Sequence, residues 1–219
     1  MKKTLLILTL LGFAVLMQAQ GFHFGPRVGM NMATFVEKGN ESYNVDKTTK
    51  LGFQLGATAE FEVFSFLYIG TTVSIFQSGN KYKDDTFTSK STFTNIKIPV
   101  DIGYKLPIGN VSVFGSVGPY VSVALIGKSR YVYNSDDEFM EEMEETSVYD
   151  IEFGENSYNK RLDTGLSISA GVDYRQYQAK INYSFGLRDL TTNYDFGTSY
   201  KTTSSILNIS LAYFVGRSE

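Results

Sequence analysis

Polar and apolar residues alternate in eight runs along this chain, and polar segments separate the runs. Because successive side chains of a strand point to opposite faces, this alternation predicts β-strands with one apolar and one polar face. Within residues 161–174, for example, Leu166 and Ile168 fall on one face and Ser167 and Ser169 on the other. The predicted strands span residues 25–36, 50–62, 66–78, 92–105, 111–125, 161–174, 178–190 and 202–216.

The connections between these runs are long and short in turn. The second, fourth and sixth are tight, centred on residues 63–65, 106–110 and 175–177, whereas the others are long and polar. An even number of antiparallel strands, with turns at one end and long loops at the other, is typical of outer-membrane barrels. The pattern therefore predicts an all-β fold, an eight-stranded antiparallel up-and-down transmembrane β-barrel.

A soluble barrel or sandwich would show the same alternation, with its polar face in water. The composition of the polar face favours the membrane barrel, because glycine weakens a solvent-facing strand but suits the crowded lumen of a narrow barrel. The runs are also long, as strands that cross a membrane at a tilt must be. The glycines on the polar face are Gly52, Gly56, Gly70, Gly103, Gly118, Gly165, Gly171 and Gly186.

The first residues have the pattern of a secretory signal peptide. Lys2 and Lys3 precede an apolar run over residues 5–17, which is too short to span a bilayer as a helix. We expect cleavage after Ala19, so that residues 1–19 are the signal peptide and residues 20–219 the barrel domain. With no cysteine in the chain, lipid anchoring through cysteine and disulfide bonds are both excluded. The expected location is the outer membrane.

Charged residues on the polar face would point into the lumen, where they are costly unless they are paired. The two signs are nearly balanced, which predicts a lumen neutralised by its own salt bridges rather than a field that selects ions; the alternative is a translocation or ligand site. Phe114 and Tyr120 also fall on this face and predict a lumen filled by side chains. The candidate lumen charges are Arg27, Lys97, Lys105, Lys180, Arg188, Glu60, Glu62, Asp101, Asp163 and Asp173.

Three local features carry further predictions. Pro99 and Pro119 lie within predicted strands and, because proline cannot donate to the ladder, suggest bulges. If Gln176 and Tyr177 formed a two-residue turn, Asp173 would lie opposite Lys180, Gly171 opposite Asn182 and Leu166 opposite Leu187. Aromatic residues near the strand ends predict two interfacial belts. The loop-side belt would contain Phe76, Phe93, Tyr131 and Tyr194, and the turn-side belt would contain Phe61, Phe64, Phe66, Tyr68, Tyr104, Tyr174, Tyr177 and Tyr213.

No catalytic, cofactor-binding or metal-binding residues are predicted. The acidic stretch over residues 136–145 could bind calcium, but it lacks the spacing of an EF-hand and is typical of a solvated loop. His23 is the one histidine, and nothing in the sequence pairs it with a nucleophile as a catalytic triad requires. The net charge of -3 predicts no nucleic-acid partner.

Several segments resemble porin-like outer-membrane barrels grouped with PorT. The similar segments are GPRVGMNMATF at 25–35, IKIPVDIGYKL at 96–106, VFGSVGPYVSVAL at 113–125, LDTGLSISAGVDY at 162–174 and INYSFGLRDL at 181–190. This resemblance implies an eight-stranded outer-membrane barrel; some relatives take part in protein secretion and others are structural. The chain departs from many such barrels at its end, because Phe214 lies a few residues before the C-terminus.

These observations lead to three functional hypotheses. The first is a non-enzymatic outer-membrane barrel with a filled lumen, whose external loops, chiefly residues 126–160, contact a partner protein or surface polysaccharide. Membrane lipid and lipopolysaccharide would surround it. The second is an accessory subunit of a secretion or transport assembly. The third, a membrane-embedded lipid-modifying enzyme, would have to depend on His23.

Overall fold

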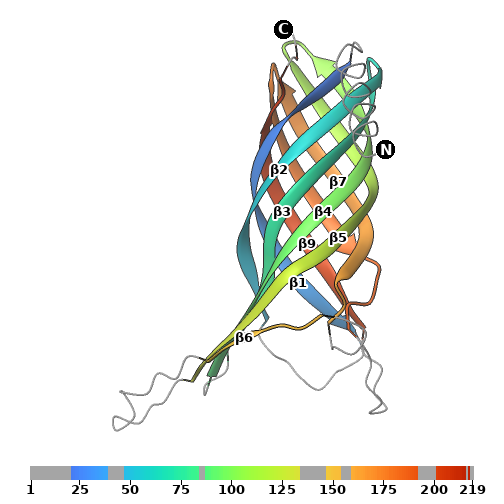
Figure 1. Ribbon diagram of the computed structural model, residues 1–219. Coiled ribbons are helices and arrows are strands. Elements are labelled where there is room, and N and C mark those ends of the chain that lie inside the picture. The colour runs from blue at the N-terminus through green and yellow to red at the C-terminus, as the bar shows by residue number, and fades with distance from the viewer. Residues whose placement is uncertain are drawn as a thin grey trace, which may run out of the picture.

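A computed structural model shows a β-barrel (Figure 1) and describes residues 21–38, 47–83, 87–133, 147–153, 159–191, 201–215 and 217. Within these ranges no helix has the length and apolar character needed to cross a membrane. The strands are β1 (Phe22–Lys38), β2 (Lys47–Phe64), β3 (Leu67–Lys83), β4 (Phe87–Ile108), β5 (Val111–Tyr133), β6 (Ser147–Asp150), β7 (Leu162–Tyr174), β8 (Tyr177–Gly186) and β9 (Lys201–Tyr213).

All strands except β6 form a closed antiparallel ring, which confirms the predicted eight-stranded up-and-down barrel. The ring runs β1, β2, β3, β4, β5, β7, β8, β9, and β1 pairs with β9 to close it. The short β6 is added to the outer part of β5, where Tyr131 pairs with Ser147 and Lys128 with Asp150. In Figure 1 the first strand begins and the last strand ends at the same end of the barrel as the tight turns, called the turn end here. The opposite end is the loop end.

The three tight connections are two-residue turns, as the pattern of short connections predicts. They consist of Ser65 and Phe66 between β2 and β3, of Gly109 and Asn110 between β4 and β5, and of residues 175–176 between β7 and β8. Gly109 has a φ of 62°, a left-handed conformation that costs glycine little.

The predicted register of the third turn is wrong. Arg175 and Gln176 form this turn, so Asp173 faces Gln178 instead of Lys180. Likewise Gly171 pairs with Lys180 instead of Asn182, and Leu166 with Phe185 instead of Leu187. The physical reason is the backbone of Arg175, whose φ of 52° opens the turn one residue earlier than expected.

The prediction of bulges at Pro99 and Pro119 is also wrong. The register of β4 with β5 is unchanged on both sides of the Pro99–Tyr120 pair, and Pro119 sits opposite Leu166 in an unshifted ladder. The bulge lies further toward the loop end, where Asn95 pairs with Ala124 but Thr94 pairs with Ile126. Leu125 is the extra residue.

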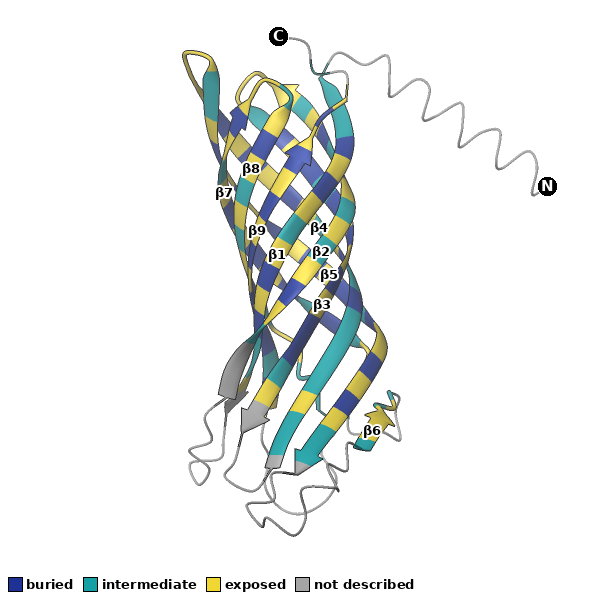
Figure 2. Cartoon of the chain, turned by 90° about the vertical axis from the view of Figure 1, so that its left-hand side faces the viewer, coloured by how far each residue is buried: buried dark blue, intermediate teal, exposed yellow. Residues whose placement is uncertain are grey.

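The two faces of the strands are those that the alternation predicts. Buried and exposed residues alternate along each strand in Figure 2, and the outer face is apolar, with Phe53 at 71% exposure. The inner face is mostly polar, and all eight glycines named above lie on it. An ideal Cβ at Gly103 would lie 2.2 Å from the ring of Tyr68, and one at Gly171 would lie 2.4 Å from Phe114. Glycine therefore leaves room for inward-pointing aromatic rings that lie over the adjacent strand, and the placement of Tyr68 in the turn-side belt is wrong.

At the loop end the structure departs from the predicted strand boundaries. Strand β3 continues to Lys83, β4 begins at Phe87 and β5 continues to Tyr133, each well past the expected limits of residues 78, 92 and 125. Together with β6 these extensions form a sheet, called the projecting sheet here, that leans away from the barrel axis in Figure 1. The projecting sheet comprises residues 80–83 of β3, 87–92 of β4, 127–133 of β5 and all of β6.

Candidate functional site

Most of the predicted lumen charges point inward, and one group of them meets at the turn end. Lys105 Nζ lies 2.7 Å from Glu60 Oε2, 3.2 Å from Glu62 Oε1 and 3.3 Å from Asp173 Oδ2. Arg217 adds a second cation, with its guanidinium 3.0 Å from Asp173 Oδ2. Because these groups are buried, pairing spares each of them the large cost of an unpaired charge.

Two further groups extend this network along the barrel. Arg27 is buried and donates hydrogen bonds to the side chains of Gln178 and Ser210, and Gln178 in turn donates to Glu60. Nearer the middle, Lys180 Nζ lies 2.7 Å from Asp101 Oδ2. A cavity of only about 30 Å³ remains beside this pair.

Three predicted lumen charges behave differently from the rest. Asp163 points inward but accepts hydrogen bonds from Tyr120 at 3.1 Å and from Ser204 at 2.6 Å rather than pairing with a cation. Lys97 is buried and donates to Ser184. The placement of Arg188 in the lumen is wrong, because β8 ends at Gly186 and the Arg188 side chain is exposed.

The aromatic residues expected in a loop-side belt instead line the interior. Phe76 is buried on the inner face of β3, and Phe93 and Tyr131 line cavities inside the loop end. Tyr194 lies outside the described residues. The sequence misplaced these rings because aromatic residues favour strands on either face.

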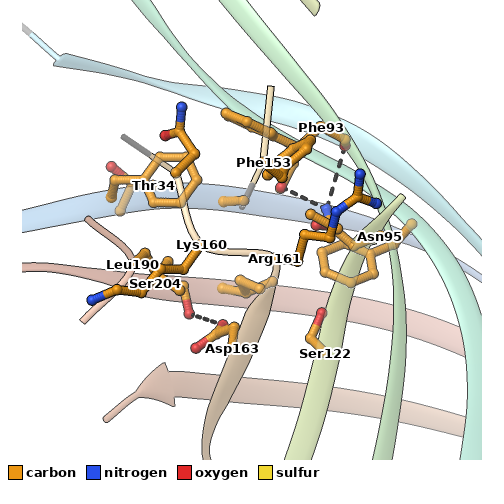
Figure 3. A pocket seen from close by; sticks show the side chains of 17 residues that line it. Thr34, Phe93, Asn95, Ser122, Phe153, Lys160, Arg161, Asp163, Leu190 and Ser204 are labelled. Atoms are coloured by element: carbon orange, nitrogen blue, oxygen red, sulfur yellow. Dashed lines mark hydrogen bonds between the residues drawn. The ribbon is translucent and has the colours of Figure 1, made fainter. Parts of the chain in front are cut away.

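The described residues surround two neighbouring cavities at the loop end. A pocket of about 60 Å³ lies among Phe35, Phe76, Phe93 and Ile206, with Asp163 also in its lining (Figure 3). A wider vestibule of about 860 Å³ shares Phe35 and Phe93 in its wall and is otherwise lined largely by polar and aromatic residues. The loop end is thus hollow, whereas the middle of the barrel is filled.

The connection after β8 is fixed at the rim of the vestibule by Asp189. Its Oδ1 accepts hydrogen bonds from the backbone N–H groups of Thr191 at 3.2 Å and Thr202 at 3.1 Å and from the Thr191 hydroxyl at 3.0 Å. Partial burial by itself would raise the pKa of Asp189, but these hydrogen bonds outweigh it and hold the pKa below its usual value. The carboxylate therefore ties the start of β9 to the end of β8.

The projecting sheet gives the loop end an exposed surface of its own. Its last strand, β6, pairs only with β5 among the described strands, so its other edge is open. Val148 and Tyr149 on β6 are 52% and 59% exposed. An open strand edge with apolar side chains is a surface on which another chain can add a strand.

Candidate chemical groups are sparse in the described part of the chain. His23 lies at the turn end with its Nε2 3.8 Å from Glu62 Oε1, and its ring packs edge-on against Phe214. Within the described ranges no three His, Cys, Asp or Glu side chains are grouped as a metal site requires. The acidic stretch over residues 136–145 lies outside the described residues.

Comparison with known families agrees with the barrel architecture. A family model described as an outer membrane protein beta-barrel domain matches residues 18–192. The chain belongs to this family. It is therefore an integral protein of the outer membrane. No protein of curated function matches the chain.

Several solved structures have a similar fold and are remote in sequence. OprG from Pseudomonas aeruginosa is 13% identical, with 89% of this chain and 96% of that chain covered and a TM-score of 0.52. Ail, the attachment invasion locus protein of Yersinia pestis, is 13% identical, with coverages of 90% and 100% and a TM-score of 0.42. The outer membrane enzyme PagL is 8% identical, with coverages of 84% and 97% and a TM-score of 0.41. At these identities the likeness shows the fold alone.

Sequence reasoning missed two sets of residues. Arg217 completes the turn-end network, yet it follows the last strand, where alternation no longer tells which way a side chain points. The outward-facing cations of the projecting sheet were assigned to loops. The signal that could have found them is the alternation of small or aromatic residues with charged ones over residues 127–131, which continues the pattern of the preceding strand. These cations are Lys81, Lys90, Lys128 and Arg130.

Proposed function

We propose that the protein is a non-enzymatic outer-membrane barrel that contacts a partner protein or surface polysaccharide through its loop end, facing the cell exterior. The observation that carries this proposal is the projecting sheet, whose outermost strand β6 pairs with no described strand other than β5 and carries the exposed Val148 and Tyr149. Rigid scaffolds commonly carry their binding residues on such extensions.

The two ends of the barrel differ in what they offer a partner. The turn end has three two-residue turns, a self-paired charge network and a space of about 430 Å³, whereas the loop end has the projecting sheet and a vestibule of about 860 Å³. A turn-end contact is what the secretion-accessory hypothesis would require. The surroundings of His23 support a non-enzymatic role, because no described residue places a nucleophile or an orienting carboxylate at hydrogen-bond distance from its ring.

Site-specific photo-crosslinking in living cells tests this proposal. A photoreactive residue would replace Val148 on β6, and the matched control would carry it at Asn110 in the turn between β4 and β5. We expect a discrete adduct from position 148 and none from position 110. An adduct from position 110 alone would favour the secretion-accessory hypothesis, and no adduct from either position would contradict the proposal.

A second variant separates binding from membrane insertion. Residues 132–156 are replaced by a Gly/Ser linker of equal length, which removes β6 but places no tension on β5 or β7. None of the replaced residues pairs with β7, so the barrel ring stays closed. We therefore expect normal insertion, together with loss of binding to the partner that crosslinks to position 148. Retention of that attachment would contradict a contact through β6.

A further inference from the structure

Four exposed cations gather on the outward face of the projecting sheet. Lys81 on β3 lies directly opposite Lys90 on β4, and Lys90 lies opposite Arg130 on β5. Lys128 stands two residues from Arg130 on the same face, and all four side chains are exposed. We propose that this cationic patch, Lys81, Lys90, Lys128 and Arg130, binds the phosphate groups of lipid molecules in the outer leaflet.

The arrangement is unfavourable for the sheet by itself. Like charges directly opposite one another on adjacent strands destabilise a sheet. Among the described residues this face also holds two carboxylates near Lys128, Asp150 directly opposite it and Glu152 two residues further along, and none of the four cations forms an ion pair with a described residue. An external anion would offset the repulsion along the row from Lys81 to Arg130.

The patch lies just beyond the lipid-facing wall of the barrel. The wall ends on β5 at the exposed Ile126, two residues before Lys128 and four before Arg130. At about 3.3 Å per residue these cations stand roughly 7 and 13 Å further along the strand. The head-group layer adds about 5–8 Å to each side of the hydrocarbon core, so long flexible side chains from this patch reach its phosphates.

The patch lies on the face that continues the lipid-facing outer wall of the barrel. In Figure 1 the projecting sheet extends away from the barrel axis at the loop end. The opposite face carries Ser91, Ser129 and Tyr131, which line the vestibule. The cations are therefore on the face nearer the lipid, and the neutral side chains are on the face nearer the lumen.

The side-chain types fit phosphate groups. Arg130 can hold two phosphate oxygens with its planar guanidinium, and the lysines supply compact charges around it. The chain as a whole has a net charge of -3, so attraction to an anionic surface must come from this patch and not from overall charge. A phosphorylated glycolipid such as lipid A, fixed at the membrane surface, presents such groups at the required level.

Binding of lipid A to the purified barrel tests the proposal. Native mass spectrometry in detergent, without divalent cations, would measure the affinity for diphosphoryl lipid A of the unmodified protein and of the double variant Lys90→Gln/Arg130→Gln. We expect this variant to bind about 30-fold more weakly, because each cation near a phosphate-bearing surface contributes about fivefold. The matched control Arg175→Gln/Arg188→Gln removes two exposed cations outside the patch and should bind within about twofold of the unmodified protein.

Three comparisons make the outcome decisive. Lys128→Gln alone should lose about fivefold and serves if the double variant folds poorly. Lipid A from which both phosphates have been removed should bind no better to the unmodified protein than to the variants. Any of three results would overturn the assignment to lipid phosphates. The first is that the unmodified protein binds the dephosphorylated lipid as tightly as diphosphoryl lipid A. The others are full competition by inorganic phosphate at the concentration of the lipid, and unchanged affinity in both variants.

Discussion

At the scale of single residues, the interior of this barrel is organised by pairs of an aromatic ring and a glycine. The Tyr68 ring covers Gly103, the Phe114 ring covers Gly171, and the Tyr120 ring lies over Gly165, 2.7 Å from where a Cβ would be. Each ring crosses from its own strand over a neighbouring strand that has no side chain in the way. Glycine is costly in a strand, and here the ring packing offsets that cost.

Substitution of Gly103 tests this packing. Gly103→Ala would place a methyl group 2.2 Å from the Tyr68 ring, so we expect the free energy of unfolding to fall by about 1–3 kcal/mol, as in other overpacked cores. The measurement is urea unfolding in detergent micelles, followed by the electrophoretic shift between the folded and unfolded barrel.

A control glycine with open surroundings is available on the outer face. The nearest atom to an ideal Cβ at Gly115 is 3.8 Å away, so Gly115→Ala should leave the unfolding midpoint unchanged or slightly raised. Equal losses in the two variants would show that the contact with Tyr68 does not set the effect.

At the scale of strands, alternation carries information only where one face is apolar. It located the lipid-facing wall and most inward charges, because membrane and lumen demand opposite side chains. Beyond the membrane both faces are polar, as at Lys128 and Ser129, and the strands could not be followed into the projecting sheet. The register of the last hairpin was missed because Arg175 adopts a left-handed φ without the usual glycine or asparagine signal.

Proteolysis of whole cells tests which end of the strands faces outward. A glutamate-specific protease added to intact cells should cleave within residues 138–145, which connect β5 to β6 at the loop end. Trypsin should cut after Arg175, in the exposed turn between β7 and β8, only once the outer membrane has been opened. Mass spectrometry of the fragments identifies each cut, and cleavage after Arg175 in intact cells would reverse the proposed orientation.

At the scale of the whole molecule, the barrel is filled in its middle and hollow at both ends, with about 860 Å³ of space at the loop end and about 430 Å³ at the turn end. Lys105, Glu60 and Asp173 form a buried network near the turns, and the Lys180–Asp101 pair lies nearer the middle. The space beside that pair is about 30 Å³, against about 860 Å³ in the vestibule. A molecule entering from the loop end therefore meets the vestibule first, and the packed side chains in the middle of the barrel lie beyond it.

This arrangement predicts that the protein forms no open channel. Eight-stranded barrels fill their interior with side chains, and barrels with an aqueous pore have about 16–18 strands. In planar-bilayer recordings we expect no large, steady conductance from the purified monomer. The double variant Tyr68→Ala/Tyr120→Ala removes two of the largest fully buried side chains. It tests whether these rings help to block the lumen. It should show brief openings if the rings help to close the lumen, whereas a steady nanosiemens conductance from the unmodified protein would contradict both the filled interior and the eight-stranded ring.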